Sequence, residues 1–170
     1  QRSIAFCTGY PDSSCENLRG RLSEVTGVPE DQMIFGNGVA ELIFRLVQEV
    51  RPKKAVIPAP SFAEYETALR SCGTEIAFFY LKEAESFFLN VSEFLDFLRT
   101  EQPEIIFLCT PANPTGAMIR QADLSKILDH CRKHGILLVL DECFVEFLDE
   151  ERSCGCIREF LDWEAGRPEH

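Results

Sequence analysis

Two acidic residues, Asp141 and Glu142, directly follow a run of five aliphatic residues at positions 136–140. A carboxylate at the end of a buried strand costs free energy unless a cation or hydrogen bonds satisfy it. A metal ion, a substrate amine or a protonated ring nitrogen would supply the positive charge, whereas a helix cap or an ion pair would be a purely structural explanation. Asp141 is therefore a candidate functional residue.

A second candidate is Asn113, which lies in the segment Thr-Pro-Ala-Asn-Pro-Thr-Gly at positions 110–116, directly after another apolar run. The two prolines restrict φ and the glycine extends the allowed backbone conformations, so the segment predicts a rigid, sharply turned loop. An asparagine held in such a loop can direct its amide at a ligand oxygen. An ordinary turn is the alternative, and we favour the functional interpretation.

Two further segments carry weaker signals. Gly36-Asn37-Gly38 precedes a helical pattern that begins at Val39, and the free backbone N–H groups of a helix start can bind a phosphate. The segment lacks the third glycine of the dinucleotide fingerprint and the Gly-Lys-Ser/Thr of a P-loop, so taken alone it is better explained as an ordinary strand–helix turn. Phe62 and Tyr65 could stack on a flat cofactor or simply join the core.

Hydrophobic periodicity predicts the elements that position these residues. We expect helices over residues 18–25, 39–50, 63–71, 91–100 and 124–131, and strands over residues 33–35, 55–57, 75–81, 105–109 and 136–140. The last two strands are apolar without alternation, which is typical of a parallel sheet covered on both faces. The pattern predicts an α/β fold with three layers, α/β/α, and a mostly parallel sheet, in which ligands bind at the carboxyl ends of the strands.

The composition narrows the class of protein. The 170 residues include 17 Lys and Arg against 28 Asp and Glu, a formal net charge of −11, which argues against nucleic-acid binding. No apolar run approaches the roughly 20 residues of a membrane span. Eight cysteines, several within apolar runs, predict reduced thiols in a cytoplasmic protein, and Cys154-Gly155-Cys156 lacks the further ligands of a metal site, so no metal is expected.

Four segments of the chain, in their order along the sequence, resemble the fold-type-I pyridoxal-phosphate-dependent enzymes of the class I/II aminotransferase family. The segments are Gly36-Asn37-Gly38, Pro60-Ser61-Phe62, Asn113-Pro114-Thr115-Gly116 and Asp141-Glu142. The histidinol-phosphate aminotransferase branch is the nearest broad group. Within it, residues 61–65, 107–111 and 141–144 are most similar to the threonine-phosphate decarboxylases of cobalamin biosynthesis.

The resemblance implies pyridoxal 5'-phosphate as cofactor and assigns residues to its phosphate and its ring. The backbone amides of Val39 and Ala40, after Gly38, would hold the phosphate at the helix start. Phe62 would stack on the pyridine ring.

The resemblance also implies two catalytic residues. Asn113 would form a hydrogen bond with the phenolic oxygen of the cofactor, and Asp141 would pair with the protonated ring nitrogen, which keeps the ring an electron sink. Phe144 stands where aminotransferases of this branch often have a tyrosine, which favours the decarboxylase branch, although phenylalanine occurs in both.

One implied residue is absent. The cofactor's Schiff-base lysine is expected about thirty residues beyond Asp141, past His170. The five lysines of the chain are in other settings: Lys53, Lys54, Lys82, Lys126 and Lys133. We therefore expect an N-terminal segment with the first helix at residues 1–30, and a partial cofactor-binding large domain at residues 31–170 that is inactive alone.

Three functional hypotheses follow. The first is a lyase resembling L-threonine O-3-phosphate decarboxylase, present here as a fragment, and the second is a histidinol-phosphate-type aminotransferase. The third, from another class, is a non-catalytic α/β binding module. The enzyme hypotheses imply a small phosphorylated amino acid or amino alcohol as substrate and a cytoplasmic homodimer, with no nucleic-acid or membrane partner.

Overall fold

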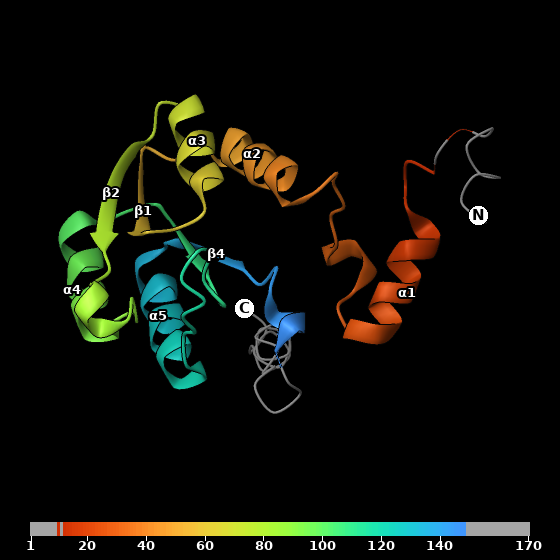
Figure 1. Cartoon of the computed structure of the whole chain (residues 1–170). Helices are drawn as coiled ribbons and strands as arrows, with labels where there is room; N and C mark the ends of the chain where they lie inside the picture. The colour runs from red at the N-terminus through yellow and green to blue at the C-terminus, as the bar shows by residue number, and fades with distance from the viewer. Residues whose placement is uncertain (1–9, 11, 149–170) are drawn as a thin grey trace. The chain divides into compact units, whose positions relative to one another are not determined.

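The computed structural model describes residue 10 and residues 12–148, and these divide into two compact units, one ending at Phe35 and one beginning at Gly36. The first unit contains α1 (Glu16–Thr26) and the short 3-10 helix η2 (Glu30–Gln32) (Figure 1). The Arg19 guanidinium links α1 to η2, because its Nη1 atom donates to the carbonyl of Glu30 at 2.6 Å. The predicted boundary between residues 30 and 31 stays a prediction.

The predicted strand at residues 33–35 is wrong. These residues form no strand, and the side chain of Ile34 is 79% exposed. The carbonyl of Met33 accepts a hydrogen bond from Arg19 Nη1 at 2.5 Å, and the guanidinium lies 5.0 Å from the ring centre of Phe35. Local side-chain contacts therefore satisfy this apolar segment in place of a neighbouring strand.

The second unit is built on a four-stranded sheet in the order β2-β1-β3-β4, in which every neighbouring pair is parallel. The strands are β1 (Lys54–Ala59), β2 (Glu75–Tyr80), β3 (Ile105–Cys109) and β4 (Leu137–Asp141). The predicted parallel sheet is confirmed. All four carboxyl ends consequently lie along one edge of the sheet, which we call the carboxyl edge, and the opposite edge is the amino edge.

Helices connect the strands and cover both faces of the sheet. The strands are connected in turn by α3 (Ala63–Ser71), α4 (Val91–Glu101) and α5 (Gln121–His134), while α2 (Val39–Val50) precedes β1. The short 3-10 helix η3 (Glu83–Glu85) lies before α4, and η4 (Val145–Phe147) follows β4. Figure 1 shows α2 and α3 on one face and α4 and α5 on the other, and each pair packs together. The three-layer α/β/α architecture is confirmed, with α2 and α3 at their predicted bounds.

Alternating side chains of the central strands bury both faces of the sheet. On one face, Ile57 of β1 and Phe107 of β3 join a core cluster with residues of α2 and α3. Their neighbours Val56, Ile106 and Leu108 point to the other face, because successive side chains of a strand alternate, and they are also buried. Burial on both faces explains why these strands show no polar alternation in the sequence.

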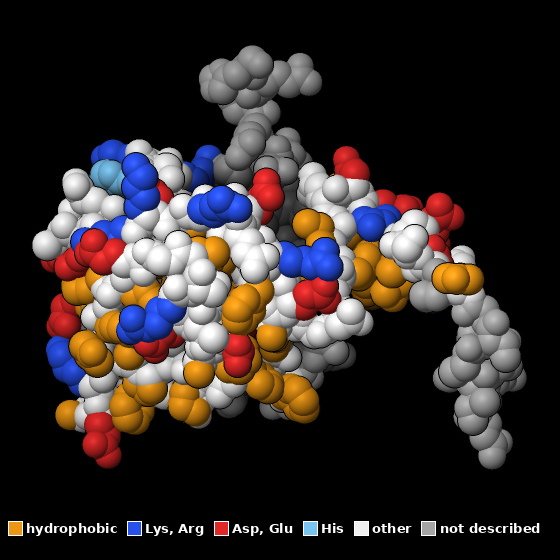
Figure 2. All heavy atoms as spheres, turned by 90° about the horizontal axis from the view of Figure 1, so that it is seen from above, with side chains coloured by type: hydrophobic (Ala, Val, Ile, Leu, Met, Phe, Trp, Pro, Cys, Tyr) orange, Lys and Arg blue, Asp and Glu red, His pale blue; other side chains and the backbone are white. Residues whose placement is uncertain are grey.

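The surface carries both signs of charge close together. In the view of Figure 2, basic and acidic side chains are interspersed among apolar ones. Arg45 pairs with Glu41 at 2.6 Å and Arg70 with Glu66 at 2.7 Å, each one helical turn apart. Among the described residues, no helix is long and apolar enough to cross a membrane.

Candidate functional site

Strand register places the first candidate residue. Asp141 is the last residue of β4 and lies opposite Cys109, the last residue of β3. The loop that contains Asn113 leaves β3 at the same point, so the two polar residues predicted from sequence belong to neighbouring strand ends. Phe62 follows β1, the next strand across the sheet, and stands at the N-cap position of α3.

Two hydrogen bonds orient the Asp141 carboxylate. The Tyr65 hydroxyl donates to its Oδ2 atom at 2.6 Å, and the backbone N–H of Cys143 donates to its Oδ1 atom at 3.0 Å. Among the described residues, no lysine or arginine forms an ion pair with this carboxylate. Neutral donors therefore hold the group in place while its negative charge remains available to a cationic ligand.

Tyr65 has a contact that the sequence did not predict. Its side chain is 1% exposed and its ring stacks on Phe107, with centroids 5.0 Å apart and planes at 22°. The same ring meets Phe62 edge to face, with centroids 5.6 Å apart. Burial, followed by the hydrogen bond to Asp141, raises the pKa of Tyr65 far above its usual value, so the hydroxyl keeps its proton and acts as the donor.

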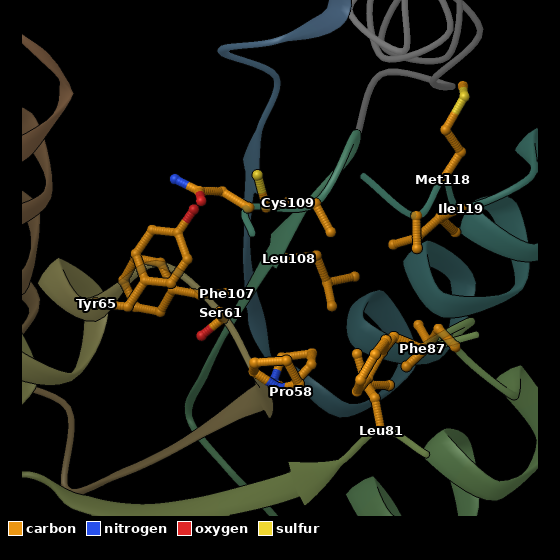
Figure 3. Close-up of a pocket in the computed structure, with 15 residues that line it drawn as sticks. Pro58, Ser61, Tyr65, Leu81, Phe87, Phe107, Leu108, Cys109, Met118 and Ile119 are labelled. Atoms are coloured by element: carbon orange, nitrogen blue, oxygen red, sulfur yellow. The ribbon is translucent and has the colours of Figure 1, made fainter. Parts of the chain in front are cut away.

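A narrow, mainly apolar pocket opens beside Tyr65 at the carboxyl ends of β1 and β3. Figure 3 shows Tyr65, Phe107 and Ser61 along one side and Met118 and Ile119 across from them. Asn113 also lines this pocket.

The loop that carries Asn113 is held by its own backbone. The N–H of Gly116 donates to the carbonyl of Ala112 at 2.7 Å, and the N–H of Ala112 donates to the carbonyl of Ala117 at 2.8 Å. This hydrogen bonding accounts for the rigid turn expected from the sequence. The structure gives the Asn113 side-chain amide no hydrogen bond to another described residue, so its donors and acceptor are available to a ligand.

Two thiols lie near the Asp141 carboxylate. Cys109 Sγ donates to the carbonyl of Pro111 at 3.1 Å, and burial together with the charge of Asp141 raises the pKa of this thiol. Cys143 is exposed, and partial desolvation of its thiol, followed by a hydrogen bond with Asp141, raises its pKa to about 12. Both thiols are therefore protonated at neutral pH and are poor nucleophiles.

The start of α2 has the features of an anion site. Gly38 is the N-cap, with φ of +89°, and no side chain caps the helix. The carboxylate of Glu41 instead accepts from the backbone N–H of Asn37 at 2.6 Å. The first-turn N–H groups of Val39 and Ala40 consequently have no side-chain cap, and the helix dipole favours a negative ligand there.

The predicted residues thus fall into two sets. Phe62 and Asp141 each contact Tyr65, and Asn113 lines the pocket beside Tyr65, which neither Phe62 nor Asp141 lines. Gly38, Val39 and Ala40 stand at the start of α2, where the Val39 side chain packs against the same core cluster as Phe62.

None of the five lysines of the chain lines the pocket. Lys54, Lys82 and Lys126 form surface ion pairs with glutamate or aspartate, and Lys53 and Lys133 are exposed. Among the described residues, no group of three or more His, Cys, Asp or Glu side chains is arranged to hold a metal ion. Cys154 and Cys156 lie outside the described residues.

Comparison with known proteins identifies the family. The family model described as "Aminotransferase class I and II" matches residues 5–164. The chain belongs to the class I and II aminotransferase family. The family resemblance predicted from the four sequence segments is confirmed.

Relatives within this aminotransferase family carry two different names. The chain is 38% identical over 142 residues to the threonine-phosphate decarboxylase of Salmonella typhimurium, a match covering 84% of this chain and 38% of that protein. It is 32% identical over 166 residues to the histidinol-phosphate aminotransferase of Methanosarcina barkeri, covering 95% of this chain and 43% of that protein. The chain therefore spans less than half the length of these relatives.

A solved structure from the aminotransferase family has the same fold. The histidinol-phosphate aminotransferase of Clostridium acetobutylicum matches with a TM-score of 0.80 at 23% identity, covering 95% of this chain and 46% of that structure. This likeness shows that the two chains share the same fold.

Proposed function

We propose that this chain is part of a pyridoxal-phosphate-dependent lyase that decarboxylates L-threonine O-3-phosphate. The observation that carries the proposal is the Asp141 carboxylate, which neutral donors orient from Tyr65 and Cys143 and which has no cationic partner among the described residues. A protonated ring nitrogen is the kind of group that this arrangement accepts. The similarity to the Salmonella typhimurium decarboxylase supports the choice of substrate.

The residues fit the cofactor in chemistry. The uncapped N–H groups of Val39 and Ala40 would bind its phosphate, and Phe62 would cover one face of its ring. Asn113 would donate its free amide to the phenolic oxygen, and Asp141 would keep the ring nitrogen protonated. When bound, pyridoxal phosphate supplies an electron sink for the carbon that loses its carboxylate.

The second candidate is a histidinol-phosphate-type aminotransferase. The specific observation in its favour is the match to the Methanosarcina barkeri protein, which covers 95% of this chain. Phe144 argues in the other direction, since the resemblance gives aminotransferases of this branch a tyrosine hydroxyl at this position more often. A non-catalytic module is disfavoured, because a pure scaffold has no need for an oriented carboxylate without a cation.

Product analysis tests the proposal. The full natural protein, loaded with pyridoxal phosphate, should release CO2 from L-threonine O-3-phosphate and should not transfer the amino group of histidinol phosphate to 2-oxoglutarate. The opposite result would establish the aminotransferase instead. Failure to bind pyridoxal phosphate at all would rule out both enzymes and leave the non-catalytic module.

The 170-residue chain alone should be inactive, because none of its lysines lines the pocket. After incubation with pyridoxal phosphate and reduction with borohydride, mass spectrometry should find no stoichiometric cofactor adduct on a single lysine. A specific adduct on one of the five lysines would contradict the assignment of the site. A homodimeric, cytoplasmic enzyme completes the proposal, and sedimentation of the natural protein measures the first of these properties.

A further inference from the structure

We infer that Tyr65 is a positioning residue for the proposed reaction, acting through Asp141 and Phe62. The inference rests on the proposed function, and it assigns to Tyr65 two tasks. Its hydroxyl holds the Asp141 carboxylate in the orientation that a protonated ring nitrogen requires. Its ring holds Phe62 where that side chain would cover the ring of the same cofactor.

The first task follows from the geometry of the carboxylate. A carboxylate attached to one strand end can rotate about its terminal bond, and one hydrogen bond leaves that rotation partly free. Here Tyr65 holds Oδ2 at 2.6 Å and the Cys143 N–H holds Oδ1 at 3.0 Å, so both oxygen atoms are fixed. Fixed orientation of a charged group is what electrostatic stabilisation of a bound cation requires.

The direction of proton transfer follows from the same contact. A hydrogen bond donated to the ionised form of a carboxyl group favours that form. When Asp141 shares a proton with a ring nitrogen, the Tyr65 hydroxyl therefore favours the arrangement in which the nitrogen carries the proton. Removal of the hydroxyl shifts the proton toward Asp141 and weakens protonation of the ring.

The second task depends on the packing of the Tyr65 ring. The ring is clamped by stacking on Phe107 of β3 and meets Phe62 edge to face. Phe107 is itself 1% exposed, so this stack belongs to the rigid core of the second unit. Through one side chain, the core sets the positions of two residues that are predicted to contact the cofactor.

A tyrosine that merely satisfies its own buried hydroxyl would show the same hydrogen bond. The two interpretations differ in what happens to the ring nitrogen of bound cofactor. The Tyr65→Phe variant separates them, because it keeps the ring contacts with Phe62 and Phe107 and removes only the hydroxyl. Tyr80→Phe is the matched control, since Tyr80 is 73% exposed on β2 and also loses one hydroxyl.

The experiment uses the full natural protein loaded with pyridoxal phosphate labelled with 15N at the ring nitrogen. The 15N chemical shift, followed against pH, reports protonation of this atom. In the Tyr65→Phe variant we expect the apparent pKa of the ring nitrogen to fall by about one unit, a tenfold weaker binding of its proton. Tyr80→Phe should leave it unchanged, and Asp141→Asn should lower it further.

The double variant Tyr65→Phe/Asp141→Asn gives the sharpest test. If Tyr65 acts through Asp141, the double variant should match Asp141→Asn alone, whereas independent effects would add. If Tyr65→Phe fails to fold, Tyr65→His, which retains a ring and a donor N–H, should give a ring-nitrogen pKa between those of the wild type and Asp141→Asn.

The outcomes separate the inference from the proposed function. A wild-type protein that binds pyridoxal phosphate, with a ring-nitrogen pKa unchanged in Tyr65→Phe, would overturn the inference and leave the proposed function in place. A wild-type protein that does not bind pyridoxal phosphate would overturn both.

Discussion

The amino edge and the carboxyl edge of the sheet use their polar groups in opposite ways. At the amino edge, the buried Thr74 hydroxyl donates to the carbonyl of Pro52 at 2.8 Å, and the N–H of Lys53 donates to Glu104 at 2.7 Å. Lys54 pairs with Glu101 at 2.8 Å and with Glu75 at 3.2 Å. Polar groups here satisfy one another across neighbouring elements.

At the carboxyl edge, equivalent groups are left for a ligand. The Asn113 amide has no described partner, the first turn of α2 has no side-chain cap, and Asp141 has hydrogen bonds but no cation. Open α/β sheets bind ligands at this edge because loops and helix starts converge there. The contrast teaches that a polar group without a protein partner is more informative about function than a polar group alone.

The largest expected effect tests the carboxyl edge directly. Asp141→Asn in the natural protein should lower kcat for decarboxylation by roughly 10²-fold to 10³-fold, because the charge opposite the ring nitrogen is removed. Asp129→Asn, which removes an exposed carboxylate from α5, should leave kcat unchanged. Equal kcat values in the two variants, measured at saturating substrate, would break the contrast between the edges.

A matched pair of glycines sharpens the contrast. Gly38 at the start of α2 has φ of +89° and Gly73 before β2 has φ of +74°, and an added Cβ would meet no atom within 4 Å at either position. Alanine at each position should destabilise the fold by about 1–2 kcal/mol through backbone strain, which urea unfolding measures. The two variants should lose similar stability, but only Gly38→Ala should also weaken the binding of pyridoxal phosphate, by about tenfold. Equal dissociation constants for pyridoxal phosphate in the two variants would show that the start of α2 does not bind the cofactor.

The smallest expected effect concerns pH at the amino edge. Burial, together with the positive charges of His134, Arg99 and Lys133, lowers the pKa of His130 below its usual value of 6.5. As the pH is lowered, His130 therefore takes up a proton in the unfolded chain before it does so in the folded chain. The contribution of neutral His130 to folding stability is complete above pH 6.5 and is lost as the pH falls toward the pKa of the folded state.

Urea midpoints measured at about pH 7.5 and about pH 5.5 should therefore differ less in His130→Gln than in the wild type. Cofactor affinity measured at the higher pH should be the same in both proteins. An equal pH dependence of the two midpoints would show that His130 titrates alike in the folded and unfolded chains.

The fold could largely be predicted from the sequence, because glycine and proline residues mark the ends of several helices and strands. The helix at residues 39–50 is bounded by Gly38 and Pro52, and its predicted bounds are those of α2. The failure at residues 33–35 has a physical cause: three apolar residues predict a strand only if another strand is available to pair with them. Here the Met33 carbonyl accepts a hydrogen bond from Arg19, and no local sequence pattern predicts that contact.

The candidate site was predictable in its residue types but not in its connections. Asp141 and Asn113 follow apolar runs, so the topology rule placed both at the carboxyl edge. The bond from Tyr65 to Asp141 joins residues 76 positions apart, and only the packing of α3 against the sheet creates it. The spacing of Phe62 and Tyr65 indicated a shared helix face and gave no indication of the hydroxyl's partner.

The double membership of Tyr65, in the interior and in the pocket, has an evolutionary consequence. Its ring packs in the core, whereas its single oxygen atom serves the Asp141 carboxylate of the proposed enzyme, so one substitution can separate the two roles. We expect that a descendant of this protein that abandoned catalysis would keep an aromatic residue here and drift from tyrosine to phenylalanine. Position 65 would then serve as a one-letter marker of whether a relative still works as an enzyme.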